Sequence, residues 1–265
     1  MGSLTARTAL VTGAAHRVGQ AIAEALAREG ADVLVHFGSS RAEAERTVAG
    51  LRSLGVQAWA LQADLGDPAR AEALWGQAEA LAGAGRIDIL VNSASTFHED
   101  TLAGLTAASL EASLRINALA PLFLARRFAA AGGGAGQGSG GPEGAPRGAR
   151  DRVIVNLLDS RMLGRMRTHV SYQMGKRLLG DFTRLLALEL APAVRVNAVA
   201  PGMILPPPGL RPEAQARLAT TNLLGRWGEP ADVARAVVFL AQNGFITGQV
   251  LFVDGGGSVK ESLFG

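Results

Sequence analysis

Short apolar runs alternate with longer amphipathic segments along nearly the whole chain. The runs are continuously apolar, which is typical of strands that are buried on both faces of a sheet. They predict strands at residues 8–12, 32–37, 56–62, 87–92, 152–158, 194–200 and 249–253. The segments between them predict helices at residues 17–29, 41–54, 68–82, 106–130, 170–190 and 230–242. This order predicts an α/β fold with a doubly wound parallel sheet and helices on both faces.

Two segments interrupt the alternation. Residues 132–149 are rich in Gly and Pro, and we interpret them as a flexible surface loop. Residues 201–225 form a long, proline-containing connection after the sixth predicted strand. Ligands of open α/β sheets bind at the carboxyl ends of strands, so we predict that this connection covers a substrate; structural irregularity is the alternative. Because the rest of the chain keeps one rhythm, we expect residues 1–265 to form a single domain.

The composition argues against several classes of function. The chain has no Cys and only four scattered His, so we expect no disulfide, no thiolate nucleophile and no metal site. Its basic residues are nearly all Arg and are spread along the chain, which does not indicate nucleic-acid binding. Since we find no signal-like start and no long apolar run, we expect a cytoplasmic protein that does not enter the membrane.

The chain has one tyrosine, Tyr172, and one of its two lysines, Lys176, follows it by four residues. On a helix this spacing puts both side chains on one face. An ammonium next to a phenol favours the phenolate, so we expect Lys176 to lower the pKa of Tyr172. Such a pair can exchange a proton with a reacting oxygen or nitrogen. The same spacing also fits a half-buried Tyr next to a solvated Lys without a catalytic role.

The segment TGAAHRVG at residues 12–19 follows the first predicted strand and opens the first predicted helix. Gly13 and Gly19 would allow a tight turn and a close approach of the backbone to a pyrophosphate. The start of the helix would offer free N–H groups and the positive end of the helix dipole. We therefore predict a dinucleotide site here.

The end of the second predicted strand indicates which dinucleotide fits. NAD-binding enzymes usually carry an acid there for the ribose 2′-hydroxyl, but this chain has none before Glu43. The positions are occupied instead by His36, Ser39, Ser40 and Arg41. Hydroxyls and an Arg suit a 2′-phosphate, which Arg17 could also approach, so we predict NADP(H). Alternatively, the two serines only cap the following helix.

Two further strand ends complete the predicted cofactor site. Asp64 and Leu65 follow the third predicted strand, where Asp64 could accept from the adenine amino group while Leu65 packs nearby. The segment NSAS at residues 92–95 ends the fourth predicted strand and would place small residues against the cofactor.

Taken in order, TG-x3-R-x-G, ADLGD, NSAS, Asn117, YxxxK and PG resemble the short-chain dehydrogenase/reductase family over nearly all of residues 7–257. The resemblance implies a Rossmann-type sheet, an NADP-dependent oxidoreductase and a homotetramer. It assigns Tyr172 as the proton donor, Lys176 to the nicotinamide ribose, and Asn117 to a water or backbone relay. It implies that the cofactor is bound by Gly13, Arg17, Val18, Gly19, His36, Ser39, Ser40, Arg41, Asp64, Leu65, Asn92, Ser93, Ala94, Tyr172, Lys176, Pro201 and Gly202.

Two positions depart from the usual pattern of this family. Arg17 replaces the usual Gly of the first loop, and Asp159 stands thirteen residues before Tyr172, where the family has Ser. A Ser would donate to a substrate carbonyl, whereas an ionised Asp only accepts. An Asp suits a pterin, which offers amino and ring N–H donors, and it could help Tyr172 to supply a proton to a ring nitrogen. If the neighbouring Ser160 held the Ser position instead, the site would be an ordinary carbonyl site.

These departures, together with Phe97, resemble pteridine reductases and the bacterial dihydromonapterin and dihydrofolate reductases. In that group an aromatic ring at the position of Phe97 and the nicotinamide sandwich the flat pterin. The resemblance implies that catalysis is carried by Asp159, Tyr172, Lys176 and Asn117. It implies that the substrate contacts Arg17, Ser95, Phe97, Asp159, Tyr172 and Met203.

Three functions remain for comparison. The first is an NADPH-dependent reductase that transfers hydride to a ring C=N of a small-molecule pterin or dihydrofolate-like substrate, with a Tyr proton donor. The alternative is an NADPH-dependent carbonyl reductase of the 3-oxoacyl or alcohol/sugar type. A nucleotide-sensing protein without turnover is opposed by the intact Tyr172, Lys176 and Asn117. We interpret His169 as a loop or cap residue and Trp227 as a packing residue.

Overall fold

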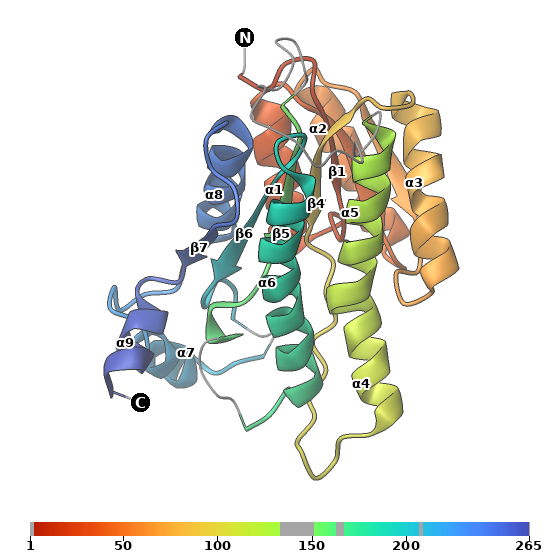
Figure 1. The fold of residues 1–265 in the computed structure, drawn as a ribbon. Helices are drawn as coiled ribbons and strands as arrows, with labels where there is room; N and C mark the ends of the chain where they lie inside the picture. Colours follow the sequence, from red (N-terminus) through yellow and green to blue (C-terminus); the bar gives the residue numbers. More distant parts are fainter. Residues whose placement is uncertain (1–2, 133–150, 163–166, 207–208, 265) are drawn as a thin grey trace.

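The structure is a computed structural model that describes residues 3–132, 151–162, 167–206 and 209–264. Within these ranges the strands form one parallel sheet in the order β3-β2-β1-β4-β5-β6-β7, and helices cover both of its faces (Figure 1). The predicted α/β, doubly wound Rossmann-type fold is therefore confirmed. The strands are β1 (Thr8–Val11), β2 (Asp32–Phe37), β3 (Ala58–Gln62), β4 (Ile87–Asn92), β5 (Val153–Leu157), β6 (Arg195–Pro201) and β7 (Val250–Val253).

The helices follow the predicted segments closely, with two additions. The α-helices are α1 (Arg17–Arg28), α2 (Arg41–Ser53), α3 (Pro68–Ala82), α4 (Ala107–Leu114), α5 (Ala120–Ala131), α6 (Val170–Leu190), α7 (Pro212–Ala219), α8 (Pro230–Gln242) and α9 (Gly257–Phe264). A π-helical segment, η1 (Arg115–Leu119), joins α4 to α5, and a short 3₁₀ segment, η2 (Ser160–Met162), follows β5. The sequence predicted neither α7 nor α9, because both are short.

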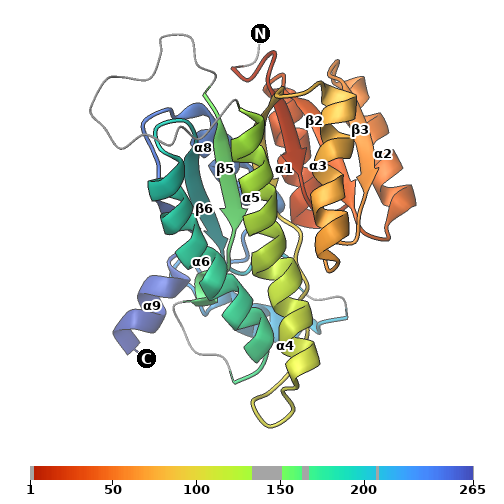
Figure 2. The same ribbon diagram turned by 45° about the vertical axis from the view of Figure 1, so that its right-hand side comes forward.

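Alternate residues of the strands supply two large apolar cores, and a smaller third one lies around Ala198 and Ala200 of β6. Ala9 and Val11 of β1 belong to the core that includes α1, α2 and α8, whereas Leu10 belongs to the core that includes α3, α5 and α6. All three side chains are fully buried. Figure 2 shows α3, α5 and α6 on one face of the sheet. Burial on both faces explains why the strand sequences do not alternate with polar residues.

The predicted helix at residues 106–130 is one continuous rod with a π-helical segment in its middle (Figure 2). The N–H of Ala120 donates to the carbonyl of Arg115, five residues earlier, instead of four. Pro121, which follows directly, has no N–H to donate and cannot continue an α-helical pattern there. The widened turn contains Asn117, in agreement with the tendency of π segments to lie at functional sites.

The two segments that interrupt the alternation have different outcomes. The predicted flexible loop at residues 132–149 lies outside the described residues except for Gly132. The predicted substrate loop at residues 201–225 contains α7, and its residues 207–208 are also outside the described part. Thus the second segment is not a continuous irregular loop but carries a helix of its own.

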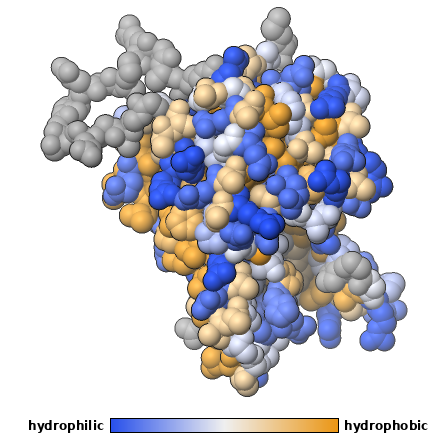
Figure 3. Space-filling view, turned by 90° about the vertical axis from the view of Figure 1, so that its right-hand side faces the viewer, coloured by the Kyte–Doolittle hydropathy of each residue, from blue (hydrophilic) through white to orange (hydrophobic). Residues whose placement is uncertain are grey.

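The described surface mixes polar and apolar side chains. Figure 3 shows the face on the α3 side, where polar residues (blue) and apolar residues (orange) are interspersed. Among the described helices, none is both long and apolar enough to span a bilayer. The part of the chain that the structure describes contains no group of three or more His, Cys, Asp or Glu that could hold a metal ion.

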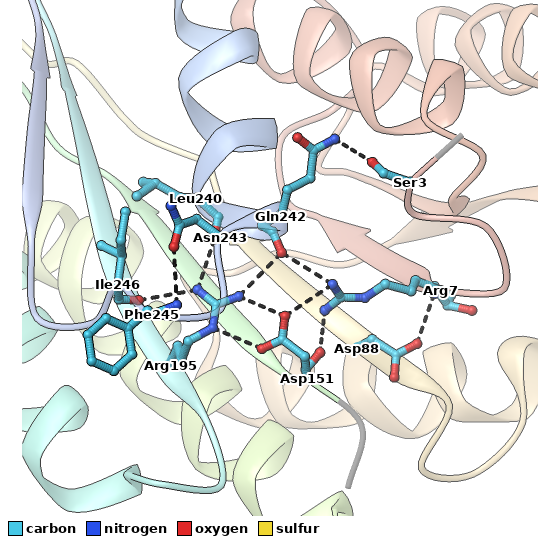
Figure 4. Close-up of polar contacts among 12 residues, drawn as sticks. Ser3, Arg7, Asp88, Asp151, Arg195, Leu240, Gln242, Asn243, Phe245 and Ile246 are labelled. Carbon is cyan, nitrogen blue, oxygen red and sulfur yellow. Dashed lines mark hydrogen bonds and ion pairs between the residues drawn. The ribbon is translucent and has the colours of Figure 1, made fainter. Parts of the chain in front are cut away.

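A polar network ties together the amino ends of several strands at the edge opposite the glycine-rich loop (Figure 4). The guanidinium of Arg195 donates to both carboxylate oxygens of Asp151, at 2.8 and 2.9 Å. Arg7 pairs with the same carboxylate at 3.4 Å. Arg195 also donates to the carbonyls of Leu240, Ala241 and Ile246. One carboxylate thus joins the starts of β1, β5 and β6 to the end of α8.

We expect Asp151→Asn to lower the free energy of unfolding by about 1–3 kcal/mol, because the side chain of Arg195 is only 10% exposed and would lose its counter-ion. Chemical denaturation at neutral pH measures this loss. Glu45→Gln is the control, since the Arg41–Glu45 pair is exposed on both sides and should contribute less than about 0.5 kcal/mol. Equal effects of the two variants would contradict the assigned role of Asp151.

The same pair predicts a dependence on pH. Burial alone would raise the pKa of Asp151, but the hydrogen bonds and charges of Arg195 and Arg7 outweigh burial and lower it. A lowered carboxyl pKa stabilises the fold above the unfolded value of about 3.9, and this stability is lost as the pH falls through the folded value. We therefore expect the difference in unfolding free energy between wild type and Asp151→Asn to shrink as the pH falls below about 4.

Candidate active site

Two adjoining cavities lie at the carboxyl ends of the strands. The first has a volume of about 660 Å³ and the second about 650 Å³. Arg17, Val18, Ser93 and Ser95 line both, so the two cavities share one wall. The first therefore has the position of a cofactor site next to β1, and the second that of a substrate site next to Tyr172.

The glycine-rich loop after β1 is packed too tightly for a larger residue at Gly13 or at Gly19. A Cβ on Gly19 would lie 2.1 Å from the carbonyl oxygen of Gly13. Gly13 itself has a φ of +66°, and a Cβ there would lie 2.8 Å from the Cα of Ala94. The loop therefore closes at the start of α1 and leaves its backbone open toward the first cavity. This arrangement fits the phosphates of a dinucleotide.

His36 holds this loop from beneath. The N–H of Gly13 donates to Nδ1 of His36 at 3.1 Å, so the ring proton is on Nε2, which donates to the carbonyl of Ala63 at 3.1 Å. The side chain is buried, and burial lowers its pKa to about 4. A neutral, internally bonded His36 positions the loop and does not offer a positive charge to a phosphate.

Arg17 has a left-handed backbone conformation, with a φ of +57°. This region favours glycine, so the Arg carries a conformational cost of about 1 kcal/mol. Its side chain lines both cavities. A strained residue of this kind is typical of functional positions.

The other predicted cofactor residues divide into two groups. The first cavity is lined by Val18, Ser39, Asp64, Leu65, Ser93 and Ala94, while Pro201 and Gly202 line the second. Ser40, Arg41 and Asn92 line neither: Ser40 is the N-cap of α2, Arg41 lies 5.4 Å from the Phe37 ring centroid, and Asn92 donates to Asn156. Ser40 makes no side-chain cap hydrogen bond, so its hydroxyl does not serve the capping alternative either.

Asp159, not Ser160, is the partner of Tyr172. The Tyr172 hydroxyl donates to Oδ2 of Asp159 at 2.8 Å, and both residues line the second cavity. Ser160 is 5% exposed and does not line this cavity. The residue thirteen positions before Tyr172 is therefore the one that reaches it.

The charges around Tyr172 act in the opposite direction to the sequence prediction. Burial raises the pKa of Tyr172 well above its ordinary value, and the charge of Asp159 raises it further. For Asp159, burial alone would raise the pKa, but hydrogen bonds and charge from Arg161 lower it, so this carboxyl is ionised at neutral pH. The net direction is therefore opposite to the lowering that we expected from Lys176, because burial and a nearby carboxylate dominate the pKa of Tyr172.

Lys176 lies on the same face of α6, as predicted, but its ammonium is directed elsewhere. Its Nζ donates to the carbonyl of Leu157 at 2.7 Å and lies 5.8 Å from the Tyr172 ring centroid. Burial lowers its pKa to about 8. The half-buried Tyr with a solvated Lys is therefore excluded, since both side chains are buried.

Asn117 fixes the loop that follows β4. Its Oδ1 accepts from the Ser95 hydroxyl at 2.8 Å and from the N–H of Thr96 at 3.1 Å. Its Nδ2 donates to the carbonyl of Thr96 at 3.0 Å and to the Ser113 hydroxyl at 3.0 Å. The side chain is fully used inside the protein, so a relay role would involve its backbone.

Phe97 stands at the mouth of the second cavity and is 52% exposed. The ring of His169 stacks on it with centroids 4.0 Å apart, and the Tyr172 ring meets it edge-on at 4.7 Å. Asp100, three residues later, accepts from the N–H of Ser171 at 3.1 Å. This bond fixes the loop of Phe97 to the start of α6. His169 is the N-cap of α6, as interpreted, but it also lies in the site.

The remaining walls include residues that sequence reasoning missed. Met203 lines the second cavity, as predicted, and so do Leu218 of α7 and Trp227. Trp227 Nε1 donates to the carbonyl of Gln215, which joins it to α7. In the first cavity Gln62 and Arg70 were also missed. Gln62 ends β3, which was an available signal, and Leu218 lies within the predicted substrate-covering segment at residues 201–225, but no sequence signal pointed to Arg70 or Trp227.

The known proteins that this chain resembles over nearly its whole length include reductases. A family model described as enoyl-(acyl carrier protein) reductase matches residues 13–258. Pteridine reductase 1 of Leishmania tarentolae is 34% identical, covering 98% of this chain and 99% of its own length. The 3-oxoacyl-[acyl-carrier-protein] reductase of Staphylococcus aureus (strain Mu50 / ATCC 700699) is 31% identical, covering 94% of this chain and 97% of its own.

A solved structure agrees with these relatives in fold. The alternative dihydrofolate reductase 1 FolM from Brucella canis, solved in complex with NADP, superimposes with a TM-score of 0.84. Its sequence is 34% identical, and the match covers 98% of this chain and 97% of that one.

We expect Arg17→Gly to have two opposite effects. It should raise the free energy of unfolding by about 1 kcal/mol, because glycine adopts the left-handed conformation freely. It should also weaken NADPH binding about tenfold with little change for NADH, because a charged partner of the 2′-phosphate is lost. Arg17→Ala is the matched control, which loses the charge and keeps the strain. An unchanged ratio of NADPH to NADH affinity, measured by calorimetry, would contradict the contact with the 2′-phosphate.

Proposed function

This chain belongs to the short-chain dehydrogenase/reductase family, and from that premise we propose that it reduces a pterin or dihydrofolate-like substrate with NADPH. It is an NADP-dependent oxidoreductase, in keeping with its family and with the NADP complexes among its structural relatives. The narrower proposal concerns the substrate. The observation that supports it is the 2.8 Å contact between the Tyr172 hydroxyl and the Asp159 carboxylate.

The chemistry of this contact favours a nitrogen heterocycle. An ionised carboxylate next to the proton donor accepts N–H groups and repels the oxygen of a plain carbonyl. Phe97 lines the same cavity with a half-exposed ring, one face of which stacks on His169, and such a ring suits a flat heterocycle. A pteridine reductase and an alternative dihydrofolate reductase are among the relatives, in agreement with this preference.

Each residue of the site would have a distinct role in this reduction. NADPH, when bound in the first cavity, supplies the hydride. Tyr172 holds the proton that a ring nitrogen would take, and Asp159 accepts an N–H of the heterocycle and orients it. Lys176, buried beside them, would hold the nicotinamide ribose once it turns from the carbonyl of Leu157. Asn117 keeps the wall of the site in place through residues 95–96.

A carbonyl reductase is the second candidate, because a 3-oxoacyl-[acyl-carrier-protein] reductase is also a relative over nearly the whole chain. This candidate would need a donor to the substrate oxygen in the place that Asp159 occupies. Ser160 does not line the cavity in the described geometry, so Tyr172 would have to act without a Ser. The position of Asp159 is what places the pterin candidate first.

The assembly and location of the protein stay predictions. A homotetramer is expected from the family resemblance alone. Leu185 and Leu188 on α6, 49% and 76% exposed, are side chains of the kind that a helix–helix interface covers. Light scattering or sedimentation of the purified protein measures the state directly.

The deciding assay is NADPH oxidation by the purified protein with dihydrobiopterin, dihydromonapterin or dihydrofolate, beside an acetoacetyl thioester. We expect turnover of the pterins. We expect Asp159→Ser to lower kcat/KM for them by about 10²–10³-fold, because a group that acts in the transition state is lost. Unimpaired pterin reduction by this variant would contradict the role of Asp159, and turnover of the thioester alone would establish the carbonyl candidate.

The buried lysine predicts the alkaline side of the pH profile. Because burial lowers the pKa of Lys176 to about 8, its ammonium loses a proton above that pH. We expect kcat/KM, which reports the free enzyme, to decline above about pH 8. Lys176→Met should be slow at every pH and lack this limb. A wild-type profile that stays level through about pH 9 would contradict the need for the ammonium.

A further inference from the structure

Arg161 makes a two-point ion pair with Asp159. The Arg161 Nε and backbone N–H donate to Oδ1 of Asp159 at 3.0 and 2.9 Å. Its Nη2 donates to Oδ2 at 2.8 Å, the same oxygen that accepts from Tyr172. Asp159 is only 8% exposed, so these donors take the place of water around it. The carboxylate is thus fixed by Arg161 on one side and meets the Tyr172 hydroxyl on the other.

The direction of the hydrogen bonds defines the resting state of the site. Because an ionised carboxylate only accepts, Tyr172 is the donor and its proton is directed at Asp159. A substrate nitrogen can take that proton only when the hydroxyl turns from Asp159. If Asp159 were protonated, the carboxyl could donate as well, and it could then hydrogen-bond to a carbonyl oxygen.

Arg161 also lies next to the place of a flat substrate. Its Cζ is 5.6 Å from the Phe97 ring centroid, and its side chain is 35% exposed. It lines the same cavity as Tyr172 and Lys176. A ring that entered this cavity to stack on Phe97 would meet the Arg161 guanidinium and the Asp159 carboxylate together.

We propose that Arg161 is a positioning residue that holds Asp159 ionised against Tyr172, so that the site accepts N–H groups and selects nitrogen heterocycles over plain carbonyl substrates. The selectivity rests on the proposed function. The positioning does not, because it concerns the protein without substrate.

Other titratable groups lie around the same carboxylate. They are the same residues in the wild type and in every variant of Arg161. Lys176 and His169 belong to α6 and its N-cap, and Arg17 lines the cavity opposite. Asp100 and Glu99 lie on the loop of Phe97, where both act on His169. Burial would raise the pKa of Asp159, and Arg161 is the main group that lowers it. A variant of Arg161 alone therefore isolates its effect.

The single tyrosine provides a direct probe. Protein labelled with ¹³C at the tyrosine Cζ gives one resonance, from Tyr172, which senses whether its partner is ionised. In the wild type we expect the part of the shift that depends on Asp159 to fall below about pH 4, where Asp159 takes a proton. In Arg161→Met we expect the midpoint to rise by about 1–3 pH units.

Three variants complete the experiment. Asp159→Asn should abolish the shift, which identifies the titrating group. Arg161→Lys retains a charge and should keep the midpoint closer to that of the wild type. If Arg161→Met does not fold, as judged by near-ultraviolet circular dichroism, Arg161→Gln keeps much of the length without the charge and carries the same expectation. An unchanged midpoint in a folded, uncharged variant overturns the proposal.

Turnover tests the selectivity separately. The ratio of kcat/KM for a dihydropterin over an acetoacetyl thioester should fall about tenfold in Arg161→Met at neutral pH, which is about 1.4 kcal/mol. A raised midpoint with an unchanged ratio overturns the selectivity. A raised midpoint in a protein that reduces no pterin means that the proposed function fails while the positioning holds. An unchanged midpoint in a protein that reduces pterins means that the positioning role of Arg161 fails while the proposed function holds.

Discussion

All strands of the sheet run parallel, so their carboxyl ends lie along one edge and every loop of the site begins there. β1 lies between β2 and β4, and the connections leave it toward opposite halves of the sheet, which opens a crevice. Gly13 after β1 and Ala94 after β4 pack closely at this point and line the first cavity, which shares a wall with the second through Arg17, Val18, Ser93 and Ser95. Asp159 follows β5, so the same constraint brings it to Tyr172 on the next helix. The parallel direction of the strands therefore brings Asp159 and Tyr172 to the same edge of the sheet, and individual contacts only refine their positions.

The sequence predicts most of this arrangement because both of its signals are local. Continuous apolar runs locate the strands, and fixed spacings place Lys176 and Asp159 relative to Tyr172. Arg161 and Trp227 escape prediction because a residue in a loop or a single 3₁₀ turn has no periodicity that indicates which way its side chain points. Asn92 is the opposite case: it follows the motif but donates to Asn156 inside the sheet.

Burial decides the electrostatics of the site, and this is where reasoning from spacing failed. A helical interval of four residues says that Lys176 and Tyr172 share a face, but not what their polar atoms bond. Each is removed from water, so each prefers its neutral form. Asp159 escapes this rule, because Arg161 supplies both a charge and three hydrogen bonds within two residues of sequence. The site thus contains an ionised carboxylate, Asp159, next to a phenol, Tyr172, whose pKa is raised.

The π-helical segment η1 sets the phase of the long rod that contains it. One extra residue rotates everything beyond it by about 100° relative to an unbroken α-helix. Within the widened turn Asn117 bonds to Ser95 and to Ser113 of α4, and beyond it Leu124 and Phe128 of α5 face the core. A single helical repeat could not satisfy both sets. The extra residue therefore allows one rod to contact both the loop of Ser95 and the apolar core. Deleting a residue from η1 would rotate one of these two faces away from its contact.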